Sequence, residues 1–217
     1  MLRFCSATAI AASLLAAFPA HAEQGDILVR LRGIVVAPTD DATDVLPDFA
    51  GGSVNVENAV VPELDFTYFL TNNIGAELIL ATSPHDIEGT GALAGLGKVG
   101  DVMALPPTLT LQYHFNPDGA IRPYAGVGVN YTVFYSEDAS KSLVGAIGAT
   151  SLDLDDSVGV AFQAGLDFDL TDRWFMNVDV KYIDIDTTAT LNTGGAINKV
   201  DVDLDPIVAG IGIGMRF

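Results

Sequence analysis

The stretch IVAGIGIGMRF, residues 207–217, alternates between two kinds of side chain along its whole length. Its odd positions, from Ile207 to Phe217, are all apolar, whereas its even positions are mostly glycine and end with Arg216. Successive side chains of a β-strand point to opposite faces, so the stretch predicts a strand with one continuous apolar face. In a barrel that spans a membrane, such a face is turned to the lipid and the other to the lumen. The stretch therefore indicates a transmembrane β-barrel, whose inward glycines leave space for bulky neighbours such as Tyr124 and the arginines.

Seven further stretches of the chain alternate in the same way. The eight predicted strands are residues 26–37, 59–70, 74–82, 105–115, 121–135, 157–170, 174–186 and 203–217. Three connections are short turns, and the long ones, rich in Gly, Asp, Ser and Thr, are residues 38–58, 83–104, 136–156 and 187–202. Short periplasmic turns and long extracellular loops are typical of outer-membrane barrels. We therefore predict an all-β fold, an eight-stranded antiparallel transmembrane β-barrel with short periplasmic turns and long extracellular loops.

The first 22 residues have the features of a secretory signal peptide. An arginine near the start is followed by a short apolar run at residues 10–18, and Ala20-His21-Ala22 matches the A-x-A cleavage pattern. The run is shorter than the ~20 residues that a membrane-spanning helix needs, which disfavours an uncleaved anchor. We therefore predict that residues 1–22 are removed on export and that residues 23–217 form the barrel, without the chain's single cysteine, Cys5.

Composition separates a membrane barrel from other β folds. Without the signal peptide, nine basic residues stand against 28 acidic ones, a formal net charge of −19 that disfavours nucleic acid as a partner. The mean hydropathy is nevertheless +0.37, which is unusual for so acidic a soluble domain. A soluble β-sandwich or lipocalin-like barrel is the alternative, because its strands also alternate. It leaves unexplained the aromatic residues that gather beside the short turns, such as Tyr68, Phe115 and Trp174.

Several short motifs follow one another along the mature chain. They are VRLRG at 29–33, VAP at 36–38, PYAGVG at 123–128, LDDS at 154–157, NVDVKY at 177–182 and GMRF at 214–217. Through these motifs the chain resembles the OmpW family of eight-stranded outer-membrane proteins. The resemblance implies a narrow barrel with a hydrophobic interior path, in the outer membrane of a Gram-negative bacterium, associated with passage of small hydrophobic compounds. It also implies bacteriocins as surface partners, since family members have served as their attachment points.

Charged side chains crowd the inward faces near the periplasmic end. An eight-stranded barrel is only wide enough for side chains to fill its interior, and an unpaired buried charge is costly. We therefore predict an ion-paired plug of Arg30, Arg32, Glu63, Asp65, Glu77, Arg122, Asp167, Asp179, Lys181 and Arg216. Paired carboxylates beside His114 suggest acid–base catalysis, but no nucleophile constellation accompanies them. We expect no enzyme and no cofactor.

Toward the long loops the same inward faces become apolar. The residues of this predicted hydrophobic lumen are Ile34, Val36, Val61, Ile79, Ala81, Phe134, Ile183 and Ile185. Such a gradient is expected of a site that admits hydrophobic molecules from outside. The alternative is that these positions pack against loops that fold inward.

Prolines mark candidate positions for a lateral opening in the wall. A proline lacks the N–H that a strand ladder uses, and Pro62, Pro106 and Pro206 lie in the outer parts of their strands. The apolar positions also change from even to odd near Asp205-Pro206, which predicts a bulge there. We expect an opening at that break before any other.

The long connections hold acidic clusters: Asp40, Asp41 and Asp44; Asp153, Asp155 and Asp156; Asp201, Asp203 and Asp205. Carboxylates suit divalent cations that would bridge to lipopolysaccharide phosphates, but none of the clusters has an EF-hand spacing. We therefore predict solvated loops and no metal site. Ser83-Pro84-His85 is a weak sign of a hydrolase, since a serine and a histidine this close in sequence are usually a coincidence.

The residues and the resemblance together predict a passive outer-membrane channel for small hydrophobic molecules, with sideways exit into the bilayer. Its expected partners are outer-membrane lipids, lipopolysaccharide and the hydrophobic solutes. The alternative is a structural or surface-interaction barrel with a closed lumen, whose loops act as a receptor or adhesion surface.

Overall fold

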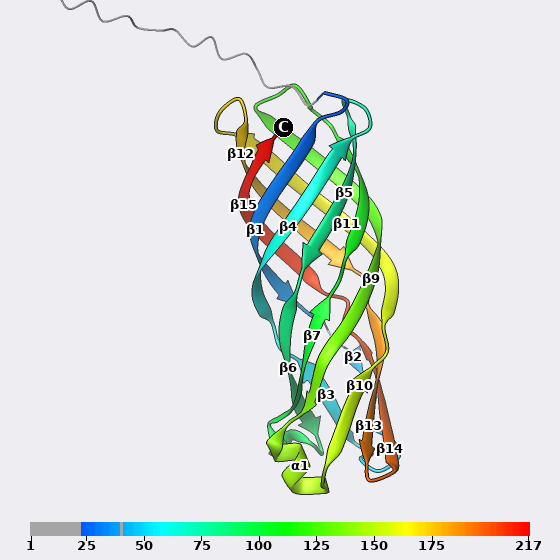
Figure 1. Ribbon diagram of the computed structural model, residues 1–217. Coiled ribbons are helices and arrows are strands. Elements are labelled where there is room, and N and C mark those ends of the chain that lie inside the picture. Colours follow the sequence, from blue (N-terminus) through cyan, green and yellow to red (C-terminus); the bar gives the residue numbers. More distant parts are fainter. Residues whose placement is uncertain (1–22, 40) are drawn as a thin grey trace, which may run out of the picture.

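Eight antiparallel strands close into a tall barrel (Figure 1) in the computed structural model, which describes residues 23–39 and 41–217. The expected signal peptide and Asp40 lie outside the described residues. In order around the wall, the strands are β1 (Ile27–Ala37), β4 (Ala59–Phe69), β5 (Ile74–Ala81), β8 (Thr108–His114), β9 (Ile121–Ala139), β11 (Ser157–Asp169), β12 (Trp174–Ile183) and β15 (Ile207–Arg216). The last strand pairs with the first, from Leu28 opposite Arg216 to Ala37 opposite Ile207. The predicted barrel is therefore confirmed.

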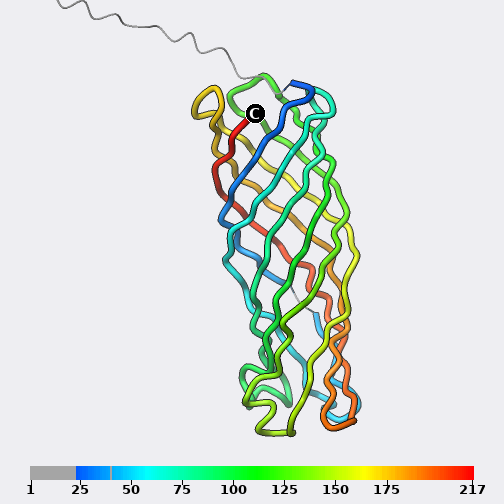
Figure 2. Tube along the Cα trace, in the orientation of Figure 1, coloured from blue at the N-terminus to red at the C-terminus, as the bar shows by residue number. Residues whose placement is uncertain are grey.

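The four long connections are not loops, as the sequence suggested, but carry strands of their own. They hold β2 (Asp41–Ala42), β3 (Gly52–Val56), β6 (Ser83–Gly91), β7 (Lys98–Leu105), β10 (Thr150–Leu154), β13 (Asp186–Thr193) and β14 (Ala196–Asp203), with a 3-10 turn at Ala94–Leu96 and helix α1 at Lys141–Ile147. Strands β3, β6 and β7 extend one side of the wall beside β9, and β2, β10, β13 and β14 form a second sheet. Figure 2 follows both groups to the end of the barrel opposite the C-terminus. None of the helices in the described part of the chain is long and apolar enough to cross a bilayer.

Side chains that alternate along each strand of the sequence lie in turn on the outer surface of the barrel and in its lumen. On β1, Leu31 is 55% exposed on the outer surface, whereas its neighbours Arg30 and Arg32 are buried in the lumen. Outward aromatics gather at the short turns, and a second group, Tyr131, Tyr135 and Tyr182, lies about half-way along the barrel. Aromatic girdles mark the two interfaces of a membrane. The strands beyond that second girdle therefore extend outside the bilayer on the extracellular side.

The predicted last strand, residues 203–217, is in fact two strands. β14 ends at Asp203 and pairs with β13, whereas β15 begins at Ile207 and pairs with β1 and β12. Between them, Asp205 has a φ of 37°, which a non-glycine residue rarely adopts. The predicted bulge is therefore wrong, because the change of face is a break where the chain passes from one sheet to another.

The inward glycines of β15 leave room for large side chains, although not for all those predicted. A side chain at Gly212 would meet Arg32, and one at Gly214 would meet the ring of Phe175. Tyr124 instead lies against Gly165 of β11, its register partner. At these positions large side chains of the lumen pack directly against glycine backbone.

Candidate functional site

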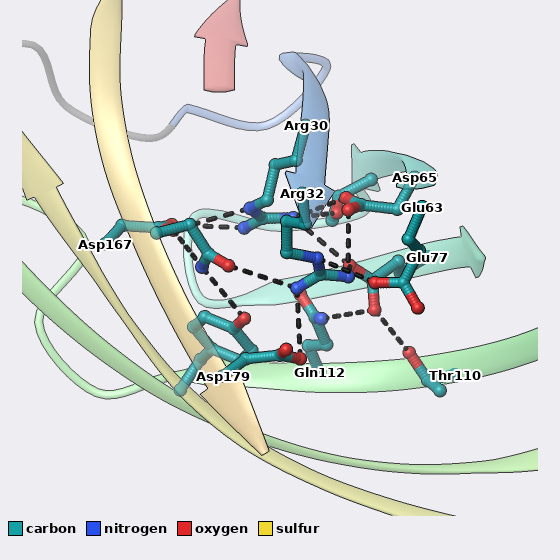
Figure 3. Close-up of polar contacts among 12 residues, drawn as sticks. Arg30, Arg32, Glu63, Asp65, Glu77, Thr110, Gln112, Asp167 and Asp179 are labelled. Atoms are coloured by element: carbon teal, nitrogen blue, oxygen red, sulfur yellow. Dashed lines mark hydrogen bonds and ion pairs between the residues drawn. The ribbon is translucent and has the colours of Figure 1, made fainter. Parts of the chain in front are cut away.

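Arg30 holds the centre of a charged floor inside the periplasmic half of the barrel (Figure 3). Its guanidinium lies 3.1 Å from Asp65, 3.2 Å from Glu77 and 3.1 Å from Asp167, and all four side chains are inaccessible to solvent. It also donates a hydrogen bond of 2.7 Å to Thr67 Oγ1. Three carboxylates from three different strands therefore share one cation.

Arg32 forms the next layer toward the extracellular side. It contacts Glu63 at 2.8 Å, Asp65 at 2.8 Å and Asp179 at 3.0 Å. Lys181 closes this layer with ion pairs of 2.9 Å to Glu63 and 3.2 Å to Asp179. Breaking such a buried pair by removing one partner leaves an uncompensated charge, so the floor resists opening.

Arg122 and a set of rings complete the floor below Arg30. Arg122 pairs with Asp169, and its guanidinium lies 5.4 Å from the ring centre of Phe175. The ring of Tyr124 stacks on His114 at 5.2 Å. Of the predicted plug residues, nine come together here, whereas Arg216 lies toward the periplasmic rim, 3.9 Å from Asp26.

Neutral polar residues of the floor were missed from the sequence. Gln112 donates to Glu77 at 2.6 Å, Gln163 donates to Asp179 at 2.9 Å, and Asn177 donates to Asp167 at 2.8 Å. All three occupy inward positions of the alternation, so the strand pattern could have found them. Gln112 reaches the Glu77 oxygen that the arginines do not contact, whereas Gln163 and Asn177 add a second donor to oxygens that Arg32 and Arg30 already contact.

An apolar cavity of about 1160 Å³, including its open part, lies above this floor. Of the predicted hydrophobic lumen, six residues line it, namely Ile34, Val36, Ile79, Ala81, Ile183 and Ile185. Val61 and Phe134 belong to the same buried apolar cluster without lining the cavity. The lining continues into the extracellular part through Val102 of β7, Leu143 of α1 and Leu152 of β10, which the sequence had assigned to loops. Residues of the long connections, among them Ile87, Val99 and Leu143, belong to the same buried apolar cluster as the predicted residues.

Strand pairing is interrupted between β4 and β6 in the wall beside this cavity. Pairing of β4 with β5 runs from Phe69–Gly75 only as far as Glu63–Ala81, and pairing of β3 with β6 begins at Val56–Ile87. Among the described residues, no ladder joins residues 59–62 to residues 82–85 between these two paired parts, and we call this stretch the unpaired interval. Pro62 lies in it on the outer face, where it cannot donate a backbone hydrogen bond.

Pro206, the first predicted opening, lines the cavity, and hydrogen bonds cross the wall around it. The carbonyl of Pro206 accepts from Ile183 N at 3.2 Å, and Thr39 N donates to the carbonyl of Leu204 at 2.9 Å. The Asp205 carboxylate accepts from Ile185 N and Tyr182 Oη as well. These contacts replace the bond that the proline cannot make. Pro106 lines the cavity between β7 and β8, where its carbonyl accepts from Thr108 Oγ1 at 3.0 Å.

Three carboxylates gather on the extracellular side of the wall. One oxygen from each of Asp184, Asp186 and Asp205 lies within 4.8 Å of the others, a spacing that a divalent cation accepts. Burial, followed by the charges of Asp203, Asp184 and Asp205, raises the pKa of Asp186. The sequence placed Asp205 in an acidic cluster but did not bring Asp184 and Asp186 to it.

Ser83 and His85, a pair that the sequence left as a coincidence, are in hydrogen-bond contact. Ser83 Oγ lies 2.9 Å from His85 Nε2, and His85 Nδ1 lies 2.9 Å from the carbonyl oxygen of Glu57. Both side chains line the cavity close to the unpaired interval.

Comparison with known proteins assigns the family. The OmpW family model matches residues 23–217. Outer membrane protein W of Vibrio cholerae is 38% identical over 216 residues, 98% of this chain and 98% of that protein. The dibenzothiophene metabolism operon protein PahQ of Pseudomonas aeruginosa is 31% identical over 169 residues, 77% of this chain and 76% of that protein. The crystal structure of OprG from Pseudomonas aeruginosa matches with a TM-score of 0.85 at 35% identity, over 91% of this chain and 98% of that one. The chain therefore belongs to the OmpW family and is a β-barrel protein of the outer membrane of Gram-negative bacteria.

Proposed function

We propose that this protein is a passive channel through which small hydrophobic molecules enter the outer membrane from outside. The observation that carries the proposal is the cavity above the charged floor, whose walls are almost wholly apolar from the extracellular part down to that floor. A solute that buries about 150 Å² of apolar surface there gains about 4 kcal/mol on leaving water. That gain draws the solute in without any chemical step.

The charged floor directs the solute sideways. Passage to the periplasm would require parting the contacts of Arg30 and Arg32 with buried carboxylates, which leaves charges without partners. The unpaired interval offers an easier route, because widening it separates no strand ladder. Backbone groups at such an edge need protein or water partners, which the extracellular interface supplies. The solute would then reach the lipid between β4 and the adjoining ends of β5 and β6.

A relative supports the same class of solute. PahQ bears the name of a dibenzothiophene metabolism operon, and dibenzothiophene is a neutral aromatic compound with no hydrogen-bond donor. A cavity lined by aliphatic side chains such as Ile34, Ile79 and Ile183 suits compounds of this kind.

Uptake by whole cells tests the proposal. We expect an Ile34→Asp or Ile183→Asp variant to abolish protein-dependent uptake of decane, because a carboxylate in the cavity lining must keep its hydration. Ile183→Val is the matched control, since it keeps the cavity apolar and should keep uptake within about twofold. Folding of each variant is checked by its heat-modifiable mobility on gels. Unchanged decane uptake in the folded aspartate variants would instead favour a surface-interaction barrel with a closed lumen.

A further inference from the structure

The polar groups at the lower end of the cavity have a specific hydrogen-bonding character. Ser83 and His85 are inward residues of β6 and are only 3% and 7% exposed. Glu63 of β4 also lines the cavity and is 3% exposed. These three side chains lie where the apolar lining meets the charged floor and the unpaired interval begins.

The protonation of the Ser83–His85 pair follows from its contacts. A backbone carbonyl can only accept, so His85 Nδ1 carries the proton that it donates to the Glu57 oxygen. Nε2 is then an acceptor, and the Ser83 hydroxyl donates its one proton to it over 2.9 Å. Burial lowers the pKa of His85, which keeps the imidazole neutral. Ser83 Oγ can therefore accept a hydrogen bond from a ligand through its lone pairs, but it cannot donate one.

Glu63 provides a second acceptor. Its Oε1 atom lies 2.8 Å from Arg32 Nε in an ion pair and accepts a hydrogen bond of 2.9 Å from Lys181 Nζ. Among the described residues, Glu63 Oε2 makes no hydrogen bond or ion pair. The floor below has fewer cations than carboxylates; the cations are Arg30, Arg32, Arg122 and Lys181, and the carboxylates are Glu63, Asp65, Glu77, Asp167, Asp169 and Asp179. The lower end of the cavity therefore repels anions.

Two other hydroxyl groups belong to the lining. Thr108 Oγ1 donates to the Pro106 carbonyl at 3.0 Å and accepts from Asn130 at 2.9 Å. Thr187 Oγ1 donates to the Asp155 carbonyl at 2.7 Å and keeps its lone pairs, but it lies in β13, in the extracellular part of the barrel. Beside the charged floor, Ser83 is therefore the hydroxyl group that is left to accept from a solute.

We propose, building on the channel function above, that the preferred solutes are neutral amphiphiles whose apolar body fills the cavity and whose terminal hydroxyl group donates a hydrogen bond to Ser83. A medium-chain primary alcohol has this chemistry. An ether of the same size lacks the donor, and a carboxylate both lacks it and carries the repelled charge. The site orients the solute with its hydroxyl group beside the unpaired interval.

The Ser83–His85 pair acts here in binding. In serine hydrolases the corresponding imidazole is backed by a buried carboxylate that stabilises the imidazolium. His85 is backed by a neutral carbonyl oxygen, which gives far less support to a charged imidazole. The geometry thus favours an oriented acceptor over an activated nucleophile.

The test compares two isomers, 1-decanol and methyl nonyl ether, in cells with and without the full-length protein. They have the same atoms and differ in the hydroxyl donor, so one net hydrogen bond predicts that protein-dependent uptake of decanol is about fivefold faster than that of the ether. Ser83→Ala should reduce this ratio to about two or less. Ser53→Ala, which removes a hydroxyl from an extracellular strand outside the cavity lining, is the matched control and should keep the ratio.

His85→Leu provides a second, independent variant. Without the imidazole, the Ser83 hydroxyl is free to donate, so uptake of the ether should rise relative to decanol. Equal rates for the two isomers in the unmodified protein, or an unchanged ratio in both folded variants, would overturn the proposal. Decane uptake distinguishes failure of the hydroxyl preference from failure of the channel. If the protein still promotes decane uptake but does not discriminate between the two isomers, only the hydroxyl preference is refuted. If all three probes enter cells equally fast with and without the protein, the channel itself is refuted.

Discussion

Tyr124 of β9 lies directly against Gly165 of β11, its partner in the strand register, so closely that a side chain at position 165 would overlap the tyrosine ring. The Tyr124 hydroxyl accepts from Asn177 at 3.0 Å, and the Arg30 guanidinium lies 5.4 Å from its ring centre. One glycine thereby allows an aromatic ring to cross the lumen and to seal the floor beneath the cavity.

Gly165→Val should therefore destabilise the barrel. The added side chain must displace Tyr124, and overpacking of this kind costs about 1–3 kcal/mol. Urea unfolding in detergent measures the change. Gly33→Val is the matched control, because position 33 faces outward with open space around it, and we expect a change below about 0.5 kcal/mol. Equal effects at the two positions would contradict the packing described here.

Arg30→Met tests the charged floor. The substitution leaves Asp65, Glu77 and Asp167 without their shared cation, and removing one partner of a buried ion pair costs about 3–5 kcal/mol. The free energy of unfolding in detergent is again the measurement. Lys98→Met removes an exposed pair with Asp86 on the extracellular part and should cost less than about 1 kcal/mol. A loss at Arg30 as small as that at Lys98 would show that the floor does not need its central cation.

The seam between β9 and β10 is held by carboxylates in place of a strand ladder. Glu137 Oε1 accepts from Leu154 N at 3.1 Å, and Asp156 Oδ1 accepts from Phe134 N at 3.4 Å. Burial raises the pKa of Glu137, so the folded protein takes up this proton at a higher pH than the unfolded chain does. The contribution of Glu137 to stability therefore does not fall as the pH drops through its raised pKa.

Hydrogen exchange at Leu154 measures that behaviour. After correction for the intrinsic pH dependence of exchange, protection of the Leu154 amide should be at least as high at pH 5 as at pH 7. Glu137→Ala should remove it, whereas Glu137→Gln keeps an acceptor and should retain most of it. Loss of protection at pH 5 in the unmodified protein would contradict this assignment.

The transmembrane part could be predicted from sequence because a bilayer imposes a simple rule on it. Every outward position of β1 or β15 must be apolar and the inward ones must pair or pack, so alternation alone separates Leu31 from Arg30. β13 lies outside the bilayer and has the sequence DTTATLNT, with polar residues on both faces. Without an alternation of apolar and polar residues, it could not be distinguished from a loop.

The opening could not be predicted in the same way. A proline shows only that one donor is missing, and whether the wall opens depends on partners far away in the sequence. At Pro206 those partners exist, in Ile183 and Thr39. At Pro62 no ladder joins β4 to the neighbouring strand between Ala81 and Ile87, and this relation appears only once the strands are paired.

Cross-linking across the unpaired interval tests whether solutes leave the barrel sideways through it. Val60 and Thr82 face outward on its two sides, and residues 23–217 contain no cysteine. A Val60→Cys, Thr82→Cys variant is treated with a bis-maleimide, and decane uptake is compared before and after linkage. An Asp86→Cys, Asp101→Cys variant, linked between two strands that are already paired, is the control. We predict at least a tenfold loss of uptake on linking the interval and none in the control, whereas undiminished uptake with the interval linked would contradict sideways exit.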